Sequence, residues 1–229
     1  MGVIYLVRHA QAPPAAYGSP GDQSATGAAL TSLGCAQARR MGEALAARGA
    51  RVDYAVSGAL PRQRQTMNIA LHAAGSEVRP DVDGRWDEYD IDAILGGGGR
   101  AATTAGRELQ TLVDDALARW VAGDSTAPAA EAYAAYQDRC ARALETASAL
   151  AGPGKTVLVV TSSGSITQIL TQLWGLDGVQ WIRMGRTMIN ASITKLIVGR
   201  TGISVVSMNE HGHLEGVDEP EHGPSMTFR

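Results

Sequence analysis

A short apolar run near the start of the chain, Val3 to Val7, is followed directly by Arg8 and His9. The run is continuous and rich in β-branched residues, which is typical of a strand covered on both faces of an α/β sheet. Ligands of such sheets bind outside the carboxyl ends of the strands. A histidine at a strand end is also common as a plain surface or hydrogen-bonded residue, so the rest of the chain must decide. On position alone, we expect Arg8 and His9 at the mouth of a site.

Strand and helix patterns alternate along the whole chain without a linker, which predicts one α/β domain over residues 1–229. Strands are expected near 3–8, 53–57, 77–82 and 156–161, and a closing hairpin over 188–198 and 203–208. Helices are expected across 31–48, 61–74, 100–120 and 129–150, with another that follows Ser162 and ends near Trp174. The helices between about 89 and 153 are interpreted as an insertion that forms a lid. The residues after about 210, rich in Gly, Pro and acidic side chains, are interpreted as a loosely held tail.

Composition excludes several classes of function. The net charge of −3 and the pI near 5.9 give no basic footprint for nucleic acid. The chain lacks a bilayer-spanning apolar stretch and a secretory leader pattern, so we expect no membrane partner and a cytoplasmic location. Cys35 and Cys140 match no metal-ligand spacing and are interpreted as reduced packing residues. His211 and His213 lack further ligands at workable spacing, so we expect no metal or other cofactor.

Three blocks of residues, taken in order, resemble one family. They are Leu6-Val7-Arg8-His9-Ala10-Gln11, then Leu30 and Thr31 with Gly34, Gln37 and Ala38, then Ser57 with Leu60, Arg62, Gln65 and Thr66. Together they resemble the histidine phosphatase superfamily, also called phosphoglycerate mutase-like. The resemblance implies an α/β three-layer sandwich with a mostly parallel central sheet and helices on both faces. It also implies a small phosphorylated substrate.

The resemblance assigns the role of nucleophile to His9, which would form a phosphohistidine that water later hydrolyses. The chemistry explains the neighbouring residue types. Arg8 and Arg62 are permanently charged and can each present a planar fork of donors to phosphate oxygens. The same cations would keep His9 neutral, with a free lone pair for attack on phosphorus.

The departing alkoxide needs a proton, and Glu88 in Trp86-Asp87-Glu88-Tyr89 is the candidate donor. Flanking aromatic side chains would desolvate its carboxyl group and raise its pKa. Asp87 is the rival. In the family, an acidic residue follows a hydrophobic one by two positions here, which Trp86 and Glu88 satisfy. Without the resemblance, the same residues would be interpreted as a solvated acidic loop.

The chain departs from the family pattern after the strand near 156–161. Family members usually carry a second catalytic histidine there, in a Ser/Thr-His-Gly-Gly pattern, whereas this chain has Thr161, Ser162, Ser163 and Gly164. Ser162 stands at the histidine position. Ser162 and Ser163, with backbone N–H groups of the following helix, would make a phosphate-binding cradle. Alternatively, these hydroxyls merely cap that helix.

A second departure lies at Ala10 and Ala12, where Gly and a hydroxyl residue are more usual in the family. The first change is mild, and the second removes a hydrogen bond to phosphate. Neither deletes the nucleophile or an arginine.

Two further features have structural interpretations beside functional ones. Trp120, Tyr133 and Tyr136 have helical spacing typical of core residues, although they would also suit an apolar acceptor site. The run from Gly96 to Gly99 lacks the Lys-Ser/Thr of a phosphate-binding loop, which favours a flexible linkage.

Our prediction is a phosphatase that hydrolyses a phosphate monoester through phospho-His9, with reduced or atypical activity because of Ser162. The alternative is a pseudoenzyme that binds a phosphorylated ligand or a protein partner. A phosphoglycerate mutase is less favoured, since the altered pocket shows no tuning for returning a phosphoryl group to its substrate.

Overall fold

The computed structural model describes residues 1–13, 30–97, 106–124, 130–216, 218–219 and 223–228. Within them, the main sheet has six strands in the order β3-β2-β4-β1-β5-β6. The strands are β1 (Gly2–Arg8), β2 (Tyr54–Ser57), β3 (Asp81–Val82), β4 (Thr156–Thr161), β5 (Ile193–Gly199) and β6 (Gly202–Glu210). Strands β1 to β4 are parallel, whereas β5 runs antiparallel to β1 and forms a hairpin with β6. The predicted mostly parallel sheet is confirmed.

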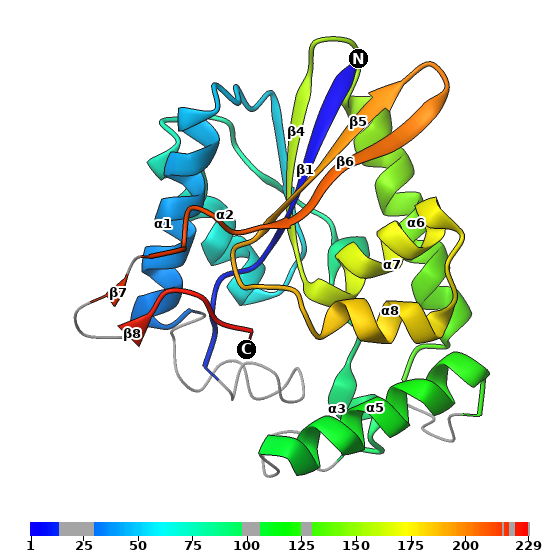
Figure 1. Cartoon of the computed structure of the whole chain (residues 1–229). Helices are drawn as coiled ribbons and strands as arrows, with labels where there is room; N and C mark the ends of the chain where they lie inside the picture. Colours follow the sequence, from blue (N-terminus) through cyan, green and yellow to red (C-terminus); the bar gives the residue numbers. More distant parts are fainter. Residues whose placement is uncertain (14–29, 98–105, 125–129, 217, 220–222, 229) are drawn as a thin grey trace.

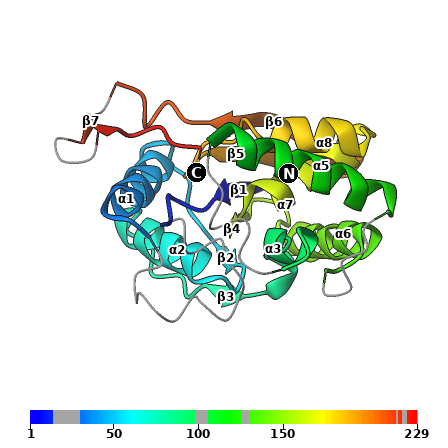
Figure 2. The ribbon, with the colours of Figure 1, turned by 90° about the horizontal axis from the view of Figure 1, so that it is seen from below.

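Helices cover both faces of this sheet, which confirms the three-layer sandwich (Figure 1). On one face lie α1 (Ser32–Ala47) and α2 (Pro61–Ala73), and on the other α6 (Tyr133–Leu150), α7 (Ser163–Trp174) and α8 (Gly178–Gly185). A short 3-10 turn, η3 (Gly84–Trp86), leads to α3 (Ile91–Ile94), and α5 (Gly106–Ala122) follows. Figure 2 shows the two helical layers on either side of the sheet. A small second sheet pairs β7 (Asp218–Glu219) with β8 (Gly223–Pro224).

Strand β1 is covered on both faces, as its apolar run predicts. Ile4 and Leu6 pack into the core beneath α6 and α7, while Tyr5 and Val7 pack into the core beneath α1 and α2. Side chains alternate across a strand, so a continuous apolar run supplies both cores at once. Burying an aliphatic side chain of this size contributes about 1.5–3 kcal/mol, so β1 is a central element of the stability.

The segment interpreted as an insertion divides into two parts. Helix α6 buries Tyr136, Cys140 and Ala143 in the same core as Ile4, so it forms part of the layer that covers the sheet. In Figure 1, α3 and α5 lie beyond the carboxyl ends of β1 and β4. Ile94 of α3 and Leu117 of α5 are nevertheless buried in the same core as α6. A lid role stays a prediction for these two helices. Sequence periodicity identified α6 as a helix, but periodicity does not say what a helix packs against.

The run from Gly96 to Gly99 lies partly outside the described residues. Gly96 and Gly97 have φ angles of 92° and 78°, in the left-handed region that favours glycine, and they directly follow α3. This pair therefore ends a helix. Gly98 and Gly99 are outside the described part of the chain.

The end of the chain is held more firmly than its composition predicts. Gln37 Nε2 donates to the Ser225 carbonyl and to Thr227 Oγ1, both at 2.8 Å. Thr227 Oγ1 in turn donates to Asn190 Oδ1 at 3.0 Å, and Leu214 is buried. Among the described residues of the segment interpreted as a loose tail, Leu214, Ser225 and Thr227 are thus tied to the rest of the fold. Buried amide side chains far away in sequence hold this segment, and local Gly and Pro content does not reveal them.

Two boundaries differ from the sequence prediction. The strand expected from Met188 begins at Ile193, because a loop in which Ala191 has a φ of 59° precedes it. Helix α8 was not predicted, although Asp177 and Gln180 form a capping box at its start.

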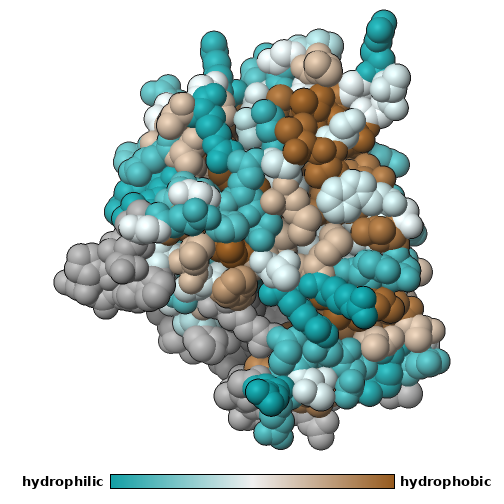
Figure 3. All heavy atoms as spheres, viewed as in Figure 1, coloured by the Kyte–Doolittle hydropathy of each residue, from teal (hydrophilic) through white to brown (hydrophobic). Residues whose placement is uncertain are grey.

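Both cysteines are without a disulfide, and Cys140 is fully buried. The helices of the described part of the chain fall short of the length and apolar character that a membrane crossing requires. Figure 3 shows apolar side chains over the hairpin of β5 and β6, whereas the face above α1 is mostly hydrophilic.

Candidate active site

His9 lies at the carboxyl end of β1, where the predicted site was expected. Its backbone N–H donates to the Thr161 carbonyl at 2.8 Å, which extends the pairing of β1 with β4. Asn190 Nδ2 donates to the His9 carbonyl at 3.1 Å, and the next N–H, of Ala10, donates to Thr66 Oγ1 at 3.0 Å. With these bonds and a side chain that is only 2% exposed, His9 is held in one position.

The hydrogen bonds of the His9 ring assign its tautomer. Nδ1 lies 2.8 Å from the Ala10 carbonyl oxygen, which can only accept, so Nδ1 carries the hydrogen. Nε2 then accepts from Arg62 Nε at 3.2 Å. The lone pair of Nε2 therefore faces the guanidinium group of Arg62.

Charge and burial keep His9 neutral. Burial of the ring is the larger cause, and the positive charges of Arg62 and Arg8 add to it, so the pKa of His9 lies well below its usual value. Both arginines are themselves nearly buried. One Arg8 nitrogen donates to the Met188 carbonyl, which fixes this guanidinium beside the histidine. The structure thus brings together the three residues predicted for the nucleophile and the phosphate site.

Glu88 belongs to the segment between η3 and α3, and its carboxyl group contacts the start of α7, the helix that follows β4. The Gly164 N–H donates to Glu88 Oε2 at 2.9 Å, and Ser163 Oγ donates to the same oxygen at 3.4 Å. Tyr136 Oη donates to Glu88 Oε1 at 3.3 Å. Burial raises the pKa of Glu88, and the Gly164 bond and the nearby arginines oppose that rise only in part. A buried carboxyl group with a raised pKa suits the predicted role of proton donor.

An aromatic cluster explains why this carboxyl group is desolvated. Its five rings pack with centroid separations of 5.1 to 6.5 Å and come from Tyr89, Trp120, Tyr133, Tyr136 and Trp181. Trp120 and Tyr136 are buried, which confirms the core interpretation for both. Tyr133 is partly buried and donates to Gln168 Oε1 at 2.9 Å. Tyr136 thus connects the aromatic core to the acid.

Asp87, the rival to Glu88, is bound elsewhere. Its Oδ1 accepts from the Ala59 N–H at 2.6 Å and from the Leu60 N–H at 3.4 Å, at the start of α2. Its carbonyl accepts from Arg139 Nη1 at 2.6 Å, and Arg139 also pairs with Glu131 at 2.6 Å. Burial raises the pKa of Asp87 as well. These contacts hold the Asp87 carboxylate at the start of α2 and join η3 to that helix. Because Asp87 is occupied in this way, Glu88 is favoured as the acid.

The two serines that follow β4 have different partners. Ser162 Oγ accepts from Gln63 Nε2 at 3.0 Å, and the Ser162 side chain makes no capping bond to α7. The capping alternative is therefore wrong for the Ser162 hydroxyl. Ser163 Oγ contacts Glu88, as described above. Their contact with phosphate stays a prediction.

Gln63 was not predicted as a site residue, and Tyr136 was expected only among core or acceptor-site aromatics. Gln63 directly follows Arg62, so its place in the same helical turn was a usable signal. No sequence signal places Tyr136 at Glu88, since the two residues lie 48 positions apart.

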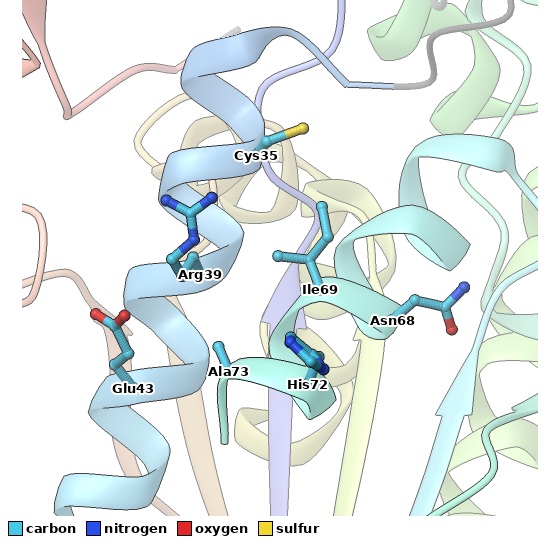
Figure 4. A pocket seen from close by; sticks show the side chains of 7 residues that line it. All are labelled: Cys35, Arg39, Glu43, Asn68, Ile69, His72 and Ala73. Carbon is cyan, nitrogen blue, oxygen red and sulfur yellow. The ribbon is translucent and has the colours of Figure 1, made fainter. Parts of the chain in front are cut away.

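His211, His213 and a hollow between α1 and α2 lie outside this site. His213 Nε2 lies 3.1 Å from the Ala191 carbonyl, and burial lowers its pKa to about 4, while His211 lies 3.2 Å from Glu215. The described residues hold no group of His, Cys, Asp or Glu suited to a metal ion. Figure 4 shows a hollow between α1 and α2, lined by Cys35, Arg39, Glu43, Asn68, Ile69, His72 and Ala73. It shares no lining residue with the His9 cluster.

At the end of β1, His9 thus contacts one buried arginine and feels the positive charge of a second, an arrangement that would suit phosphoryl chemistry. The family model of the histidine phosphatase superfamily (branch 1) matches residues 4–211, and the chain belongs to that family.

Solved structures agree with the fold. A mutant phosphoserine phosphatase from Entamoeba histolytica, in complex with phosphoserine, is 18% identical with a TM-score of 0.66, over 93% of this chain and 100% of that one. YhfR from Bacillus stearothermophilus is 18% identical with a TM-score of 0.69, over 92% and 98%. A mycobacterial glucosyl-3-phosphoglycerate phosphatase is 21% identical with a TM-score of 0.65, over 91% and 99%. No curated protein matches the sequence. At these identities the structural likeness concerns the fold.

Proposed function

We propose that the protein is a phosphatase that hydrolyses small phosphate monoesters through a phosphohistidine on His9. The observation that carries the proposal is the buried, neutral His9, whose Nε2 accepts a hydrogen bond from Arg62. Membership of the histidine phosphatase superfamily supports a phosphatase activity.

In the first step, Arg8 and Arg62 bind oxygens of the phosphate group. Engagement of Arg62 by phosphate releases His9 Nε2, whose lone pair attacks phosphorus. A nitrogen–phosphorus bond forms, the ester oxygen–phosphorus bond breaks, and its electron pair leaves with the alkoxide. Glu88 gives its proton to that oxygen, which departs as an alcohol. The raised pKa of Glu88 and the lowered pKa of His9 both favour the protonation states that this step needs.

In the second step, the Glu88 carboxylate takes a proton from water as the water oxygen attacks phosphorus. The nitrogen–phosphorus bond breaks, and its electron pair returns to Nε2. Inorganic phosphate leaves, Glu88 is protonated again and His9 is neutral. Ser162 and Ser163 lie at the start of α7, next to the two strand ends, and we place them at the phosphate oxygens.

The test is release of inorganic phosphate from para-nitrophenyl phosphate by the purified protein, compared with His9→Ala. His72→Ala is the matched control, because His72 lines the hollow between α1 and α2, which shares no lining residue with the His9 cluster. We expect turnover in the wild type and the control, and none above background in His9→Ala. Equal rates for the wild type and His9→Ala would refute the proposal. If the wild type and His9→Ala bind inorganic phosphate equally well and neither shows turnover, the pseudoenzyme is favoured.

A further inference from the structure

The first turn of α2 reaches the ends of two neighbouring strands with two consecutive residues. Arg62 contacts His9 after β1, and Gln63 contacts Ser162 after β4. Arg8 and Thr161 are direct partners in the parallel pairing of these strands. The residues that follow them, His9 and Ser162, therefore lie side by side at the same edge of the sheet.

The surroundings of Gln63 fix which way its carboxamide points. Oε1 accepts from the Leu60 N–H at 3.2 Å, which can only donate. Nε2 donates to the Trp86 carbonyl at 3.1 Å, which can only accept, and to Ser162 Oγ at 3.0 Å. Gln63 is fully buried and Ser162 is 1% exposed, so water does not compete for these bonds. The amide group is therefore the donor and Ser162 Oγ the acceptor.

The bond from Gln63 leaves the hydrogen of the Ser162 hydroxyl group available as a donor. A hydroxyl group has one hydrogen and two acceptor lone pairs. Because Gln63 occupies an acceptor position, the Ser162 hydrogen remains available for donation to another group. Hydrogen bonds in a chain polarise one another in a buried setting, so the donor strength of this hydroxyl is increased.

We propose that Gln63 is a positioning residue that directs the Ser162 O–H toward a non-bridging oxygen of the phosphoryl group on His9. Ser162 would then supply a neutral donor from the position where the family usually carries a histidine. The inference rests on the proposed function and assigns to Gln63 the orientation of the Ser162 hydroxyl group. It also explains why a buried carboxamide stands beside Arg62 in this chain.

The test is a double-mutant cycle on kcat with para-nitrophenyl phosphate, built from Ser162→Ala and Gln63→Leu. We expect Ser162→Ala to lower kcat by about 100-fold, the effect of removing one preorganised oxyanion donor. Gln63→Leu should lower kcat by about 10-fold in the wild type and cause no further loss in Ser162→Ala. Gln63→Glu, which keeps the shape but replaces the donor with an acceptor, should also lower kcat and serves if Gln63→Leu fails to fold.

Gln168→Leu is the matched control, because Gln168 is an equally buried glutamine whose oxygen binds Tyr133. Ser162→Thr, which keeps a hydroxyl group, should retain more activity than Ser162→Ala. If the losses from Gln63 and Ser162 multiply, Gln63 acts only on the general structure and the inference is wrong. His9-dependent turnover that is unchanged in Ser162→Ala would overturn this inference alone. Absence of His9-dependent turnover in the wild type would overturn the proposed function as well.

Discussion

A methyl group at Gly164 should displace the proposed acid. A Cβ built at this position would lie 2.3 Å from Glu88 Oε1, 2.5 Å from Tyr89 Cε1 and 2.9 Å from Tyr136 Oη. Ordinary contacts between such atoms are about 3.5 Å, so the Glu88 carboxyl group must retreat by roughly 1 Å. A misplacement of that size in a reacting group costs about 100-fold in rate, or about 3 kcal/mol in the barrier. We therefore expect Gly164→Ala to lower kcat by about two orders of magnitude.

The assay compares two substrates, ethyl phosphate and para-nitrophenyl phosphate. The alkoxide of ethyl phosphate is a poor leaving group and needs the proton from Glu88, whereas para-nitrophenolate leaves with little help. Gly164→Ala should therefore lose far more activity toward ethyl phosphate.

Gly185→Ala is the control, because its Cβ would meet only Thr167 Oγ1, at 3.9 Å. Circular dichroism would verify that both variants are folded. Unchanged turnover of ethyl phosphate by folded Gly164→Ala would refute the reasoning about Glu88.

Three further predictions concern pH and stability. Turnover of ethyl phosphate should fall as pH rises through the raised pKa of Glu88, because only the protonated acid donates; in a pH–rate profile, Glu88→Gln should be slower and lack this fall. Arg139→Met should lower the free energy of unfolding in urea by about 2–4 kcal/mol, since a partly buried ion pair and charged bonds to carbonyl groups are lost; an unchanged midpoint would contradict this. Thr227→Val removes hydrogen bonds to Gln37 and Asn190 and should cost about 1–3 kcal/mol in the same measurement, whereas a truly loose tail would show no loss.

Local patterns predicted the sheet and the helices next to it. The apolar run of β1 was sufficient because alternation across a strand supplies both cores from consecutive residues. The position of His9 followed from the end of that run. The nearness of Arg62 and Glu88 required the family resemblance, because nothing in local periodicity brings α2 and the loop before α3 to the same strand end.

The contacts that the sequence did not reveal are all between distant residues. Gln63 and Ser162 are 99 positions apart, and Gln37 and Thr227 are 190 positions apart. Such bonds depend on side-chain directions after folding. For the same reason, composition and order alone did not reveal the packing of α6 against the sheet or the hydrogen bonds that hold Ser225 and Thr227.

The central claim is that His9 carries the phosphoryl group. The direct measurement starts from a reaction with a radiolabelled phosphate monoester that is quenched rapidly. The stability of the protein-bound label to acid and to alkali is then measured, and the labelled peptide is identified. The account predicts an alkali-stable, acid-labile label on the peptide that contains His9, formed as fast as turnover and absent in His9→Ala. Label on another residue, or full turnover by His9→Ala, would contradict it.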